Sequence, residues 1–496
     1  MLKERTARDR KTIVSDKDTL KKMIREQRSV LSAYQTGLKE AKIPVMVIFE
    51  GWGAAGKGFL IGRVIRNLDP RFYTVHTLDT DPLPEEQRRP FLYRYMKEIP
   101  QAGRFGFFDT CWMTEVTGGL LNGSLAQEDF ENRIREINTT ERQLTDNGYV
   151  LLKYFLQIDR KEQKKRLEVL QESADTRWRV NAADLWENKH YDTCYSVYDR
   201  FLEETDSPQA PWYVIDAVGR LSAEYQVLLY LNQAIGAALE NRAAAVPIPQ
   251  NRFPLQAPPL LRDVDLSPSV EPDTYKKELK KLQSKLSDLH NRLYRKQIPV
   301  IICYEGWDAA GKGGNIRRIT EALDARGYTV WPIASPQPDE KARHYLWRFW
   351  TRLPKTGHIA VFDRTWYGRV MVERLEGFCS ENDWQRAYNE INEFEEILTD
   401  WGAVVIKFWV QIDKDTQLAR FTDRQNTPEK QWKITDEDWR NREKWDLYEE
   451  AVNEMLQKTS TSFAPWHILE SNDKKYARLK ALRIVIEEIE KQIEFT

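Results

Sequence analysis

Short continuous apolar runs alternate along this chain with longer segments in which apolar and charged residues recur at helical spacing. The first run, residues 43–49, follows an amphipathic charged segment over residues 18–41. A continuous apolar run of this length is typical of a strand buried on both faces of a parallel sheet. Strands that alternate with helices predict a three-layer α/β/α fold around a parallel sheet. Two further strands are predicted at residues 106–108 and 150–156.

The order of these elements repeats in the second half of the chain. Lys57 lies 255 residues before Lys312, and Asp109 lies 254 residues before Asp363. A period of this length indicates two copies of one domain and excludes a solenoid of short repeats. In the second copy the helix is predicted at residues 273–296, and the strands at 298–304, 359–362 and 404–410.

Prolines cluster between the two copies, from Pro247 to Pro272. Proline fixes φ and removes a backbone donor, so an extended and semi-rigid linker is predicted there. We predict a first domain over residues 1–245, a linker over 246–270 and a second domain over 271–496. The length of 496 residues agrees with this division, because one hydrophobic core rarely exceeds about 250–300 residues.

A glycine-rich sequence follows the first predicted strand of each copy. In the second copy it runs from Glu305 to Gly313, and the corresponding sequence of the first copy differs only by Gly53 in place of Asp308. A strand, then glycines and a lysine, then a helix is the context of a phosphate-binding loop, whose N–H groups converge on phosphate oxygens. Lys312 would add a full positive charge. The other predicted phosphate contacts are Gly306, Ala309, Ala310, Gly311, Gly313 and Gly314.

Two aspartates of the second copy are candidate metal ligands. The Ser or Thr that usually follows the loop lysine is replaced by Gly313, so that the loop carboxylate of Asp308 is the alternative ligand. Asp363 ends a predicted strand, which is the Walker B position that holds Mg²⁺ in phosphate-loop enzymes. We predict Mg²⁺ at this pair, with Mn²⁺ as an alternative. Arg364 and Arg369 follow in the sequence, and guanidinium groups bind phosphate in a bidentate manner.

Further basic residues form a candidate track for a polyanion. Arg348 and Arg352 are four residues apart and would share a helix face, although a solvated face is the alternative interpretation. Arg420 and Arg424 lie where nucleotide kinases have a lid over the phosphates, and they are predicted to clamp phosphate there. A plain charged helical hairpin is the alternative for that segment.

Composition narrows the function classes. The chain has 41% hydrophobic and 30% charged residues and a net charge of −1, so a polyanionic substrate must be met by a local basic cluster and nucleic acid is not expected as a partner. The four cysteines have no metal or redox spacing. No apolar run approaches the roughly 20 residues of a membrane span, and no signal sequence is visible. We therefore expect a cytoplasmic enzyme that does not bind membranes.

The residues Gly-Trp-Asp-Ala-Ala-Gly-Lys-Gly-Gly at 306–314, together with Asp-Arg-Thr-Trp-Tyr-Gly-Arg at 363–369, resemble the second family of polyphosphate kinases. The duplication resembles the two-domain members of that family, the polyphosphate:AMP phosphotransferases. The resemblance implies thymidylate-kinase-like phosphate-loop domains and Mg²⁺-dependent phosphoryl transfer from inorganic polyphosphate to AMP, which forms ADP. By the resemblance, Asp308 and Asp363 bind the metal, Lys312 contacts the transferred group, and Arg364 and Arg369 neutralise developing charge.

The first copy lacks much of this charge. It retains Lys57, Asp109 and Arg166 but has lost the loop carboxylate at Gly53. We predict that it has a structural or regulatory role and no turnover. Its other replacements are Thr110 for Arg364, Met113 for Tyr367, Glu115 for Arg369 and Leu170 for Arg424.

Three alternatives remain open from the residues alone. The acceptor could be ADP, which would yield ATP. The chain could be an ATP-dependent nucleoside monophosphate kinase, although this does not explain Asp308 together with Gly313. It could also be a non-catalytic regulator that binds polyphosphate or nucleotide, which the intact second site argues against. Base preference and the formation of a homo-oligomer are not determined by the sequence.

Overall fold

The computed structural model describes residues 1–5, 16–78, 82–240 and 246–495, and the predicted boundary at residue 245 lies outside them. The chain forms two compact units, which are described separately. Each unit consists mainly of one sequence copy and includes a short segment of the other copy, which the sequence did not predict. Unit 1 comprises Met1–Leu83, Arg94–Ala245 and Pro338–His344, and unit 2 comprises Pro84–Tyr93, Val246–Gln337 and Tyr345–Thr496.

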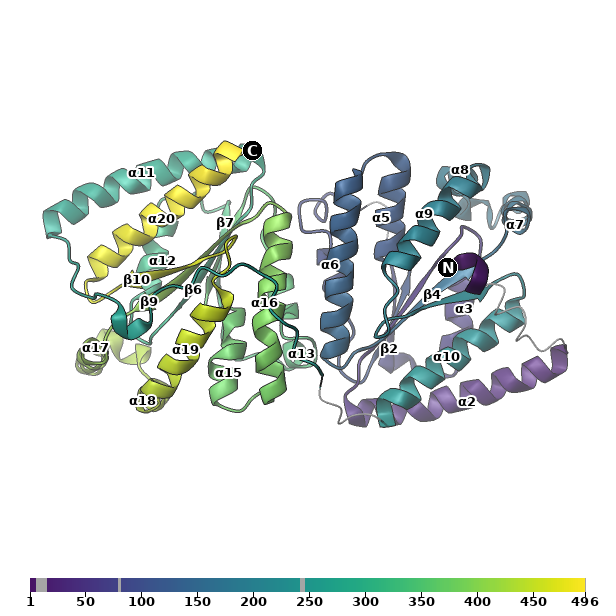
Figure 1. Ribbon diagram of the computed structural model, residues 1–496, viewed down its shortest axis with the longest axis horizontal. Coiled ribbons are helices and arrows are strands. Elements are labelled where there is room, and N and C mark those ends of the chain that lie inside the picture. The colour runs from purple at the N-terminus through teal and green to yellow at the C-terminus, as the bar shows by residue number, and fades with distance from the viewer. Residues whose placement is uncertain (6–15, 79–81, 241–245, 496) are drawn as a thin grey trace. The chain divides into compact units, whose positions relative to one another are not determined.

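Unit 1 contains a five-stranded parallel sheet in the order β2-β3-β1-β4-β5, with helices on both faces (Figure 1). The fold prediction of α/β with a parallel sheet is confirmed. The strands are β1 (Val45–Gly51), β2 (Tyr73–Thr77), β3 (Phe105–Asp109), β4 (Val150–Gln157) and β5 (Trp212–Asp216). The main helices are α2 (Lys17–Ala41), α3 (Lys57–Val64), α5 (Trp112–Asn122), α6 (Gln127–Asp146), α7 (Arg160–Glu172), α8 (Ala182–Lys189), α9 (Tyr191–Glu204) and α10 (Arg220–Glu240), with the short α4 (Tyr93–Met96).

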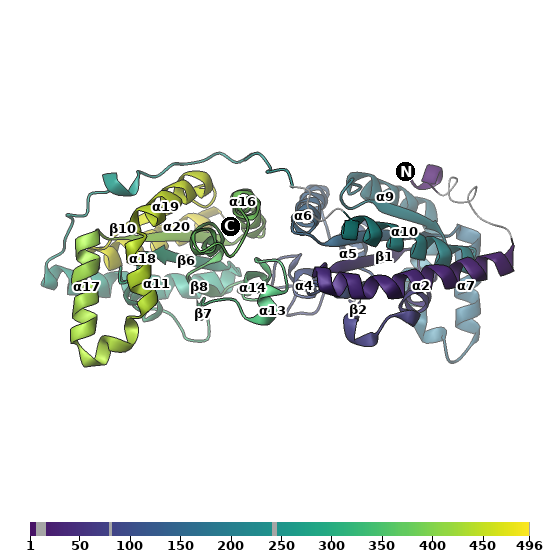
Figure 2. The same cartoon turned by 90° about the horizontal axis from the view of Figure 1, so that it is seen from below.

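Unit 2 repeats the same topology with the sheet order β10-β9-β6-β8-β7 (Figure 2). The strands are β6 (Val300–Gly306), β7 (Tyr328–Pro332), β8 (Ile359–Asp363), β9 (Val404–Gln411) and β10 (Trp466–Glu470). The main helices are α11 (Pro272–Lys296), α12 (Lys312–Thr320), α16 (Glu381–Asp400), α17 (Lys414–Asn426), α18 (Asp436–Glu443), α19 (Trp445–Thr459) and α20 (Lys474–Phe495), with the short α14 (Trp347–Trp350) and α15 (Val372–Leu375). The short α13 (Pro338–Lys341) comes from the second sequence copy but belongs to unit 1.

The predicted first helix of each copy is confirmed, and so is its amphipathic role. In unit 1, Asp16 caps α2 by accepting from the backbone N–H of Thr19 at 2.8 Å. Leu20, Ile24 and Leu31 form the buried stripe of the helix, which packs on α10. Burial of such a stripe stabilises a surface helix more than its intrinsic propensity does.

Four strands were not predicted: β2, β5, β7 and β10. They are only five residues long and lie at the two edges of each sheet. Edge strands have one free side and are partly exposed, as the mixed burial of β2 and β7 shows. β2 and β7 therefore carry no continuous apolar run, which was the signal that identified the central strands. β5 does contain a short apolar run, Trp212–Ile215, from which no strand was predicted.

The proline-rich stretch packs along unit 2 in a largely extended form. Phe253 and Leu261 are buried, and Leu255 forms an isolated antiparallel bridge with Thr461. The backbone N–H of Leu261 donates to Asn453 Oδ1 at 2.9 Å. Regular structure within this stretch is limited to a single-turn 3₁₀ helix at Leu261–Asp263.

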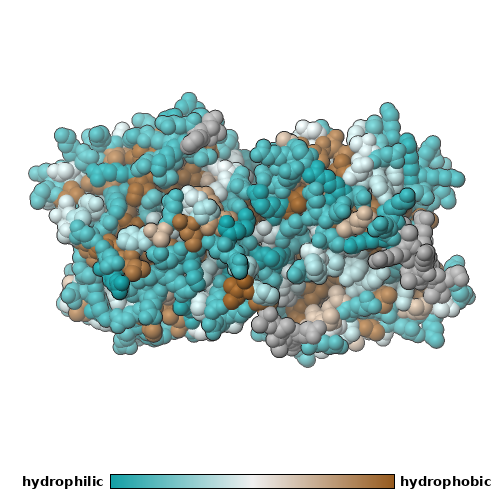
Figure 3. Space-filling model, in the orientation of Figure 1, coloured by the Kyte–Doolittle hydropathy of each residue, from teal (hydrophilic) through white to brown (hydrophobic). Residues whose placement is uncertain are grey.

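Hydrophilic side chains cover most of the visible face of each unit, with apolar residues in scattered patches (Figure 3). Among the described residues, no helix has both the length and the apolar character needed to cross a membrane.

The strand order fixes where the site can form. β6 lies between β8 and β9, with Tyr304 of β6 paired with Asp363 of β8. The carboxyl ends of these parallel strands therefore meet at one edge of the sheet, where ligands bind in open α/β folds. The glycine loop after β6 and the aspartate that ends β8 are adjacent for this reason.

Candidate functional site

The loop after β6 is shaped by two glycines. Gly306 has φ of 149°, and a Cβ built there would lie 2.5 Å from the carbonyl oxygen of Val410 in the neighbouring strand, so only glycine fits. Gly311 has φ of 113° and is the N-cap of α12. Lys312 Nζ donates to the carbonyl oxygens of Gly306 at 2.6 Å and Trp307 at 3.2 Å. The ammonium group thus lies inside the turn that would surround a phosphate.

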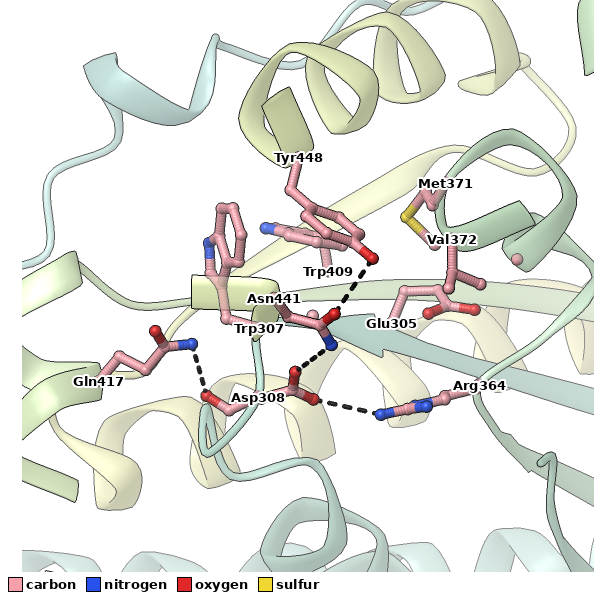
Figure 4. Close-up of a pocket in the computed structure, with 12 residues that line it drawn as sticks. Glu305, Trp307, Asp308, Arg364, Met371, Val372, Trp409, Gln417, Asn441 and Tyr448 are labelled. Carbon is pink, nitrogen blue, oxygen red and sulfur yellow. Dashed lines mark hydrogen bonds and ion pairs between the residues drawn. The ribbon is translucent and has the colours of Figure 1, made fainter. Parts of the chain in front are cut away.

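A cavity of about 650 Å³ opens over this loop. It brings together the predicted residues Asp308, Lys312, Asp363, Arg364 and Arg424. A smaller neighbouring cavity shares Trp307, Asp308, Arg364 and Asn441 with it. The walls of the smaller cavity are largely apolar and include Met371, Val372, Trp409 and Tyr448 (Figure 4).

Asp308 is held from three directions (Figure 4). Its Oδ1 accepts from Arg364 Nη2 at 3.2 Å, and its Oδ2 accepts from Asn441 Nδ2 at 3.1 Å. Its backbone carbonyl accepts from Gln417 Nε2 at 3.1 Å. The side chain of Asp308 is 16% exposed, whereas that of Arg364 is 50% exposed. Arg364 can therefore turn towards an incoming anion, while the carboxylate stays at the base of the cavity.

Glu305 shapes the turn after β8, a role that was not predicted. Its Oε1 accepts from the backbone N–H of Thr365 at 2.7 Å and from Thr365 Oγ1 at 2.8 Å. Burial raises the pKa of Glu305, and the hydrogen bonds from Thr365 oppose this shift. Arg364 has φ of 67°, a left-handed conformation that costs roughly 1–2 kcal/mol in a non-glycine residue. Glu305 could have been identified from the sequence, because it is a carboxylate in an otherwise apolar strand.

The residues present fit a divalent metal. The carboxylates of Asp308 and Asp363 line the same cavity as Lys312. Mg²⁺ commonly binds through one or two carboxylates, with substrate phosphates and water completing its octahedron. Within the ranges that the structure describes, no group of three or more His, Cys, Asp or Glu side chains could hold a metal alone. Asp308 and Asp363 are the residues that would hold such a metal.

Arg420 does not lie as the predicted phosphate clamp would. Its guanidinium donates to the carbonyl oxygens of Ala309 and Ala310, each at 3.0 Å, and to those of Ser471 and Asn472. Burial, and then the charge of Arg424, lowers its pKa to about 10. Because backbone carbonyl oxygens accept hydrogen bonds from its guanidinium group, Arg420 stabilises the loop backbone. Arg166 makes the equivalent contacts in unit 1, with Ala54, Ala55, Ala217 and Val218.

Three other predicted arginines lie outside both cavities. Arg369 pairs with Glu373 at 2.9 Å. Arg348 is buried and donates to the carbonyl oxygen of Ala334 at 3.0 Å. Arg352 donates to the carbonyl oxygen of Arg348 and lies beyond the four-residue helix α14, so the two arginines do not share a face of one helix as predicted. The structure shows that their donors serve local contacts.

Two basic residues beside the loop were missed. Lys474 and Arg478 lie in the first turns of α20. A Cβ built on Gly314 would lie 3.0 Å from Arg478 Nη2, and one on Gly311 would lie 3.8 Å from Lys474 Cγ. Burial, and then the charges of Arg420 and Arg478, lowers the pKa of Lys474 to about 8. Lys474 and Arg478 could have been identified from the sequence, because they lie four residues apart at the start of a helix.

The corresponding loop of unit 1 has a different charge pattern. Glu187 of α8 accepts from the backbone N–H of Gly53 at 2.9 Å, and burial raises its pKa. Glu115 contacts Arg94 at 3.4 Å. Glu224, which occupies the sequence position of Arg478, is buried and pairs with Arg28 and Arg63. Carboxylates thus stand where unit 2 has an amide or a cation.

Restoring the missing loop carboxylate of unit 1 is expected to destabilise it. A Cβ built on Gly53 would clash with Asp184 Oδ1 and lie 3.1 Å from Glu187 Oε2. Gly53→Asp should therefore lower the free energy of unfolding by about 1–3 kcal/mol, because it adds both overpacking and like charge. Thermal unfolding measures this. An unchanged melting temperature would contradict the packing of α8 against the loop.

Known proteins with similar sequences and structures identify the family of this chain. The sequence pattern of the polyphosphate kinase 2 family matches residues 14–243 and 269–495. A polyphosphate:AMP phosphotransferase of Pseudomonas aeruginosa is 39% identical over 484 residues, which is 96% of each chain. One of Pseudomonas syringae pv. tomato is 40% identical over 482 residues, again 96% of each. A crystal structure described as polyphosphate kinase 2 from Pseudomonas aeruginosa aligns with a TM-score of 0.83, at 38% identity and 97% coverage of both chains.

Proposed function

The chain belongs to the polyphosphate kinase 2 family, and we propose that it transfers the terminal phosphoryl group of inorganic polyphosphate to AMP, which yields ADP and a polyphosphate shorter by one unit. The single observation that carries this proposal is the cavity of unit 2, in which Lys312, Arg364 and Arg424 line the same space as Asp308 and Asp363. The full-length relatives named as polyphosphate:AMP phosphotransferases support AMP as the acceptor.

The proposed reaction requires no covalent bond between the protein and the phosphoryl group. Phosphoryl transfer depends on bringing two polyanions into line and on neutralising their charge. We assign Lys312 to the transferred phosphoryl group, and Arg364 to the developing charge between donor and acceptor. Arg424 would hold the donor as it leaves the loop, with Lys474 and Arg478 continuing the basic surface on which a long polyphosphate could lie.

A divalent metal completes the proposal. Asp308 and Asp363 would hold Mg²⁺, or Mn²⁺ in its place, and the metal would neutralise phosphate charge when bound. Both aspartates line the cavity that contains Lys312. Removal of divalent metal by a chelator is expected to abolish turnover and to leave the fold intact, since unit 2 buries its core without the site. Circular dichroism beside the activity assay separates the two effects.

One assay tests the proposed reaction. Purified protein with Mg²⁺ is incubated with AMP or ADP and with polyphosphate or ATP, and the nucleotides are separated by chromatography. The proposal predicts ADP from AMP when polyphosphate is the donor. Formation of ADP from AMP only with ATP would indicate a nucleoside monophosphate kinase. Formation of ATP from ADP without any conversion of AMP would indicate the other acceptor.

A further inference from the structure

The corner between α18 and α19 is fixed to the phosphate loop of unit 2 by several contacts. Trp445, the first residue of α19, stacks on Trp307 of the loop with ring centroids 3.7 Å apart and planes at 8°. Arg442 donates to Gln417 Oε1 at 3.2 Å. The contact between Asn441 and Asp308 lies within this corner (Figure 4). The helix that would cover the phosphates is thereby joined directly to the loop carboxylate.

Unit 1 forms the same corner with its own residues. Tyr191 of α9 stacks on Trp52 with centroids 3.9 Å apart and planes at 10°. Asn188 donates to Gln163 Oε1 at 2.9 Å, as Arg442 does to the equivalent glutamine. Gln163 Nε2 contacts the carbonyl oxygen of Gly53 at 3.4 Å. The corner is therefore a conserved piece of architecture within this chain, whether or not the loop carries a carboxylate.

One contact in this corner differs between the units in a reciprocal way. In unit 2 the loop supplies a carboxylate, Asp308, and the helix supplies an amide, Asn441. In unit 1 the helix supplies the carboxylate, Glu187, and the loop supplies the backbone N–H of Gly53. Each of these hydrogen bonds thus has one carboxylate, which comes from the loop in unit 2 and from the helix in unit 1. Two carboxylates there would repel each other in a partly buried setting.

We propose that Asn441 is a positioning residue for Asp308: its neutral amide fixes one carboxylate oxygen and allows the loop to keep its charge. Asn441 Nδ2 donates to Oδ2, and Arg364 donates to Oδ1. Tyr448 lies 3.5 Å from Asn441 Oδ1 and can donate to it, which leaves Nδ2 facing the aspartate. Asn441 acts through Asp308. The inference rests on the proposed function for what Asp308 holds.

The decisive experiment is a reciprocal exchange measured by thermal unfolding in the presence of a chelator. Asn441→Asp places two carboxylates in contact, and is expected to lower the melting temperature by about 3–5 °C. The double variant Asp308→Asn with Asn441→Asp restores one carboxylate and one amide, so it should regain most of that loss while remaining inactive. Asn291→Asp makes the same chemical change at an exposed position of α11, and should shift the melting temperature by less than about 1 °C.

A second measurement is the dependence of the reaction rate on Mg²⁺ concentration. Asn441→Ala should raise the Mg²⁺ concentration for half-maximal rate about tenfold, with the KM for AMP changed less than about twofold, and Asn441→Gln should recover part of the loss. The proposal would be overturned if the single variant Asn441→Asp and the double variant with Asp308→Asn lost the same amount of melting temperature. An unchanged Mg²⁺ dependence in Asn441→Ala would also overturn it. The unfolding experiment needs no substrate, so it remains informative if the proposed reaction is not observed.

Discussion

Replacement of Lys312 by alanine is expected to lower kcat/KM for phosphoryl transfer by about 10³-fold or more, the range found for charged groups that clamp a transferring phosphoryl group. The ammonium lies inside the loop on two carbonyl oxygens. Burial lowers the pKa of Lys312, and the charge of Asp308 opposes that shift. A cation held in this way requires no reorganisation when the phosphate arrives, so its loss should fall mainly on kcat.

Steady-state kinetics with polyphosphate and AMP measure this effect. The melting temperature should be recorded beside it, because Lys312 also bonds to the loop backbone. A variant that keeps the melting temperature of the parent but loses turnover supports a chemical role. Loss of turnover in proportion to loss of folded protein would instead make Lys312 a structural residue.

The second large effect is expected for Asp363→Ala, which should also cost about 10³-fold in turnover. Asp363 ends β8 beside Tyr304 and lines the cavity together with the loop. Its removal would leave Asp308 as the one carboxylate of the predicted metal pair. Higher Mg²⁺ should therefore restore part of the rate at most. Titration of the rate with Mg²⁺ and with Mn²⁺ tests this.

The first copy provides a matched control for this substitution. Asp109 ends β3 in the same register, and its unit is predicted to have no turnover. Asp109→Ala should leave kcat/KM within about twofold of the parent. A large loss in Asp109→Ala would show that the aspartate of unit 1 also takes part in the reaction.

The central strands and the loop could be predicted from sequence because their signals are local. β6 is a continuous apolar run, and the glycines and Lys312 that follow it have fixed spacing. Asp363 was identified in the same way, as a carboxylate at the end of an apolar strand. The short edge strand β7 carries no such run, because a partly exposed strand need not be apolar. In β10 the apolar residues are interrupted by His467.

The partners of long side chains could not be predicted. Arg420 was expected to bind phosphate and instead donates to four carbonyl oxygens, a choice made by the fold around it. Arg369 was expected near the reacting groups, yet it pairs with Glu373. Asn441 lies 133 residues from the aspartate that it contacts, and no local pattern connects the two. Tertiary structure decides such contacts.

We propose that unit 2 alone is catalytic, and a comparison of Lys57→Ala with Lys312→Ala tests this most directly. The two lysines occupy the same place in equivalent loops, and each donates to the carbonyl of the first loop glycine. Measured under the same conditions with polyphosphate and AMP, Lys57→Ala should keep turnover near that of the parent, while Lys312→Ala should lose about 10³-fold or more. Equal losses in the two variants would contradict the assignment of catalysis to unit 2 alone.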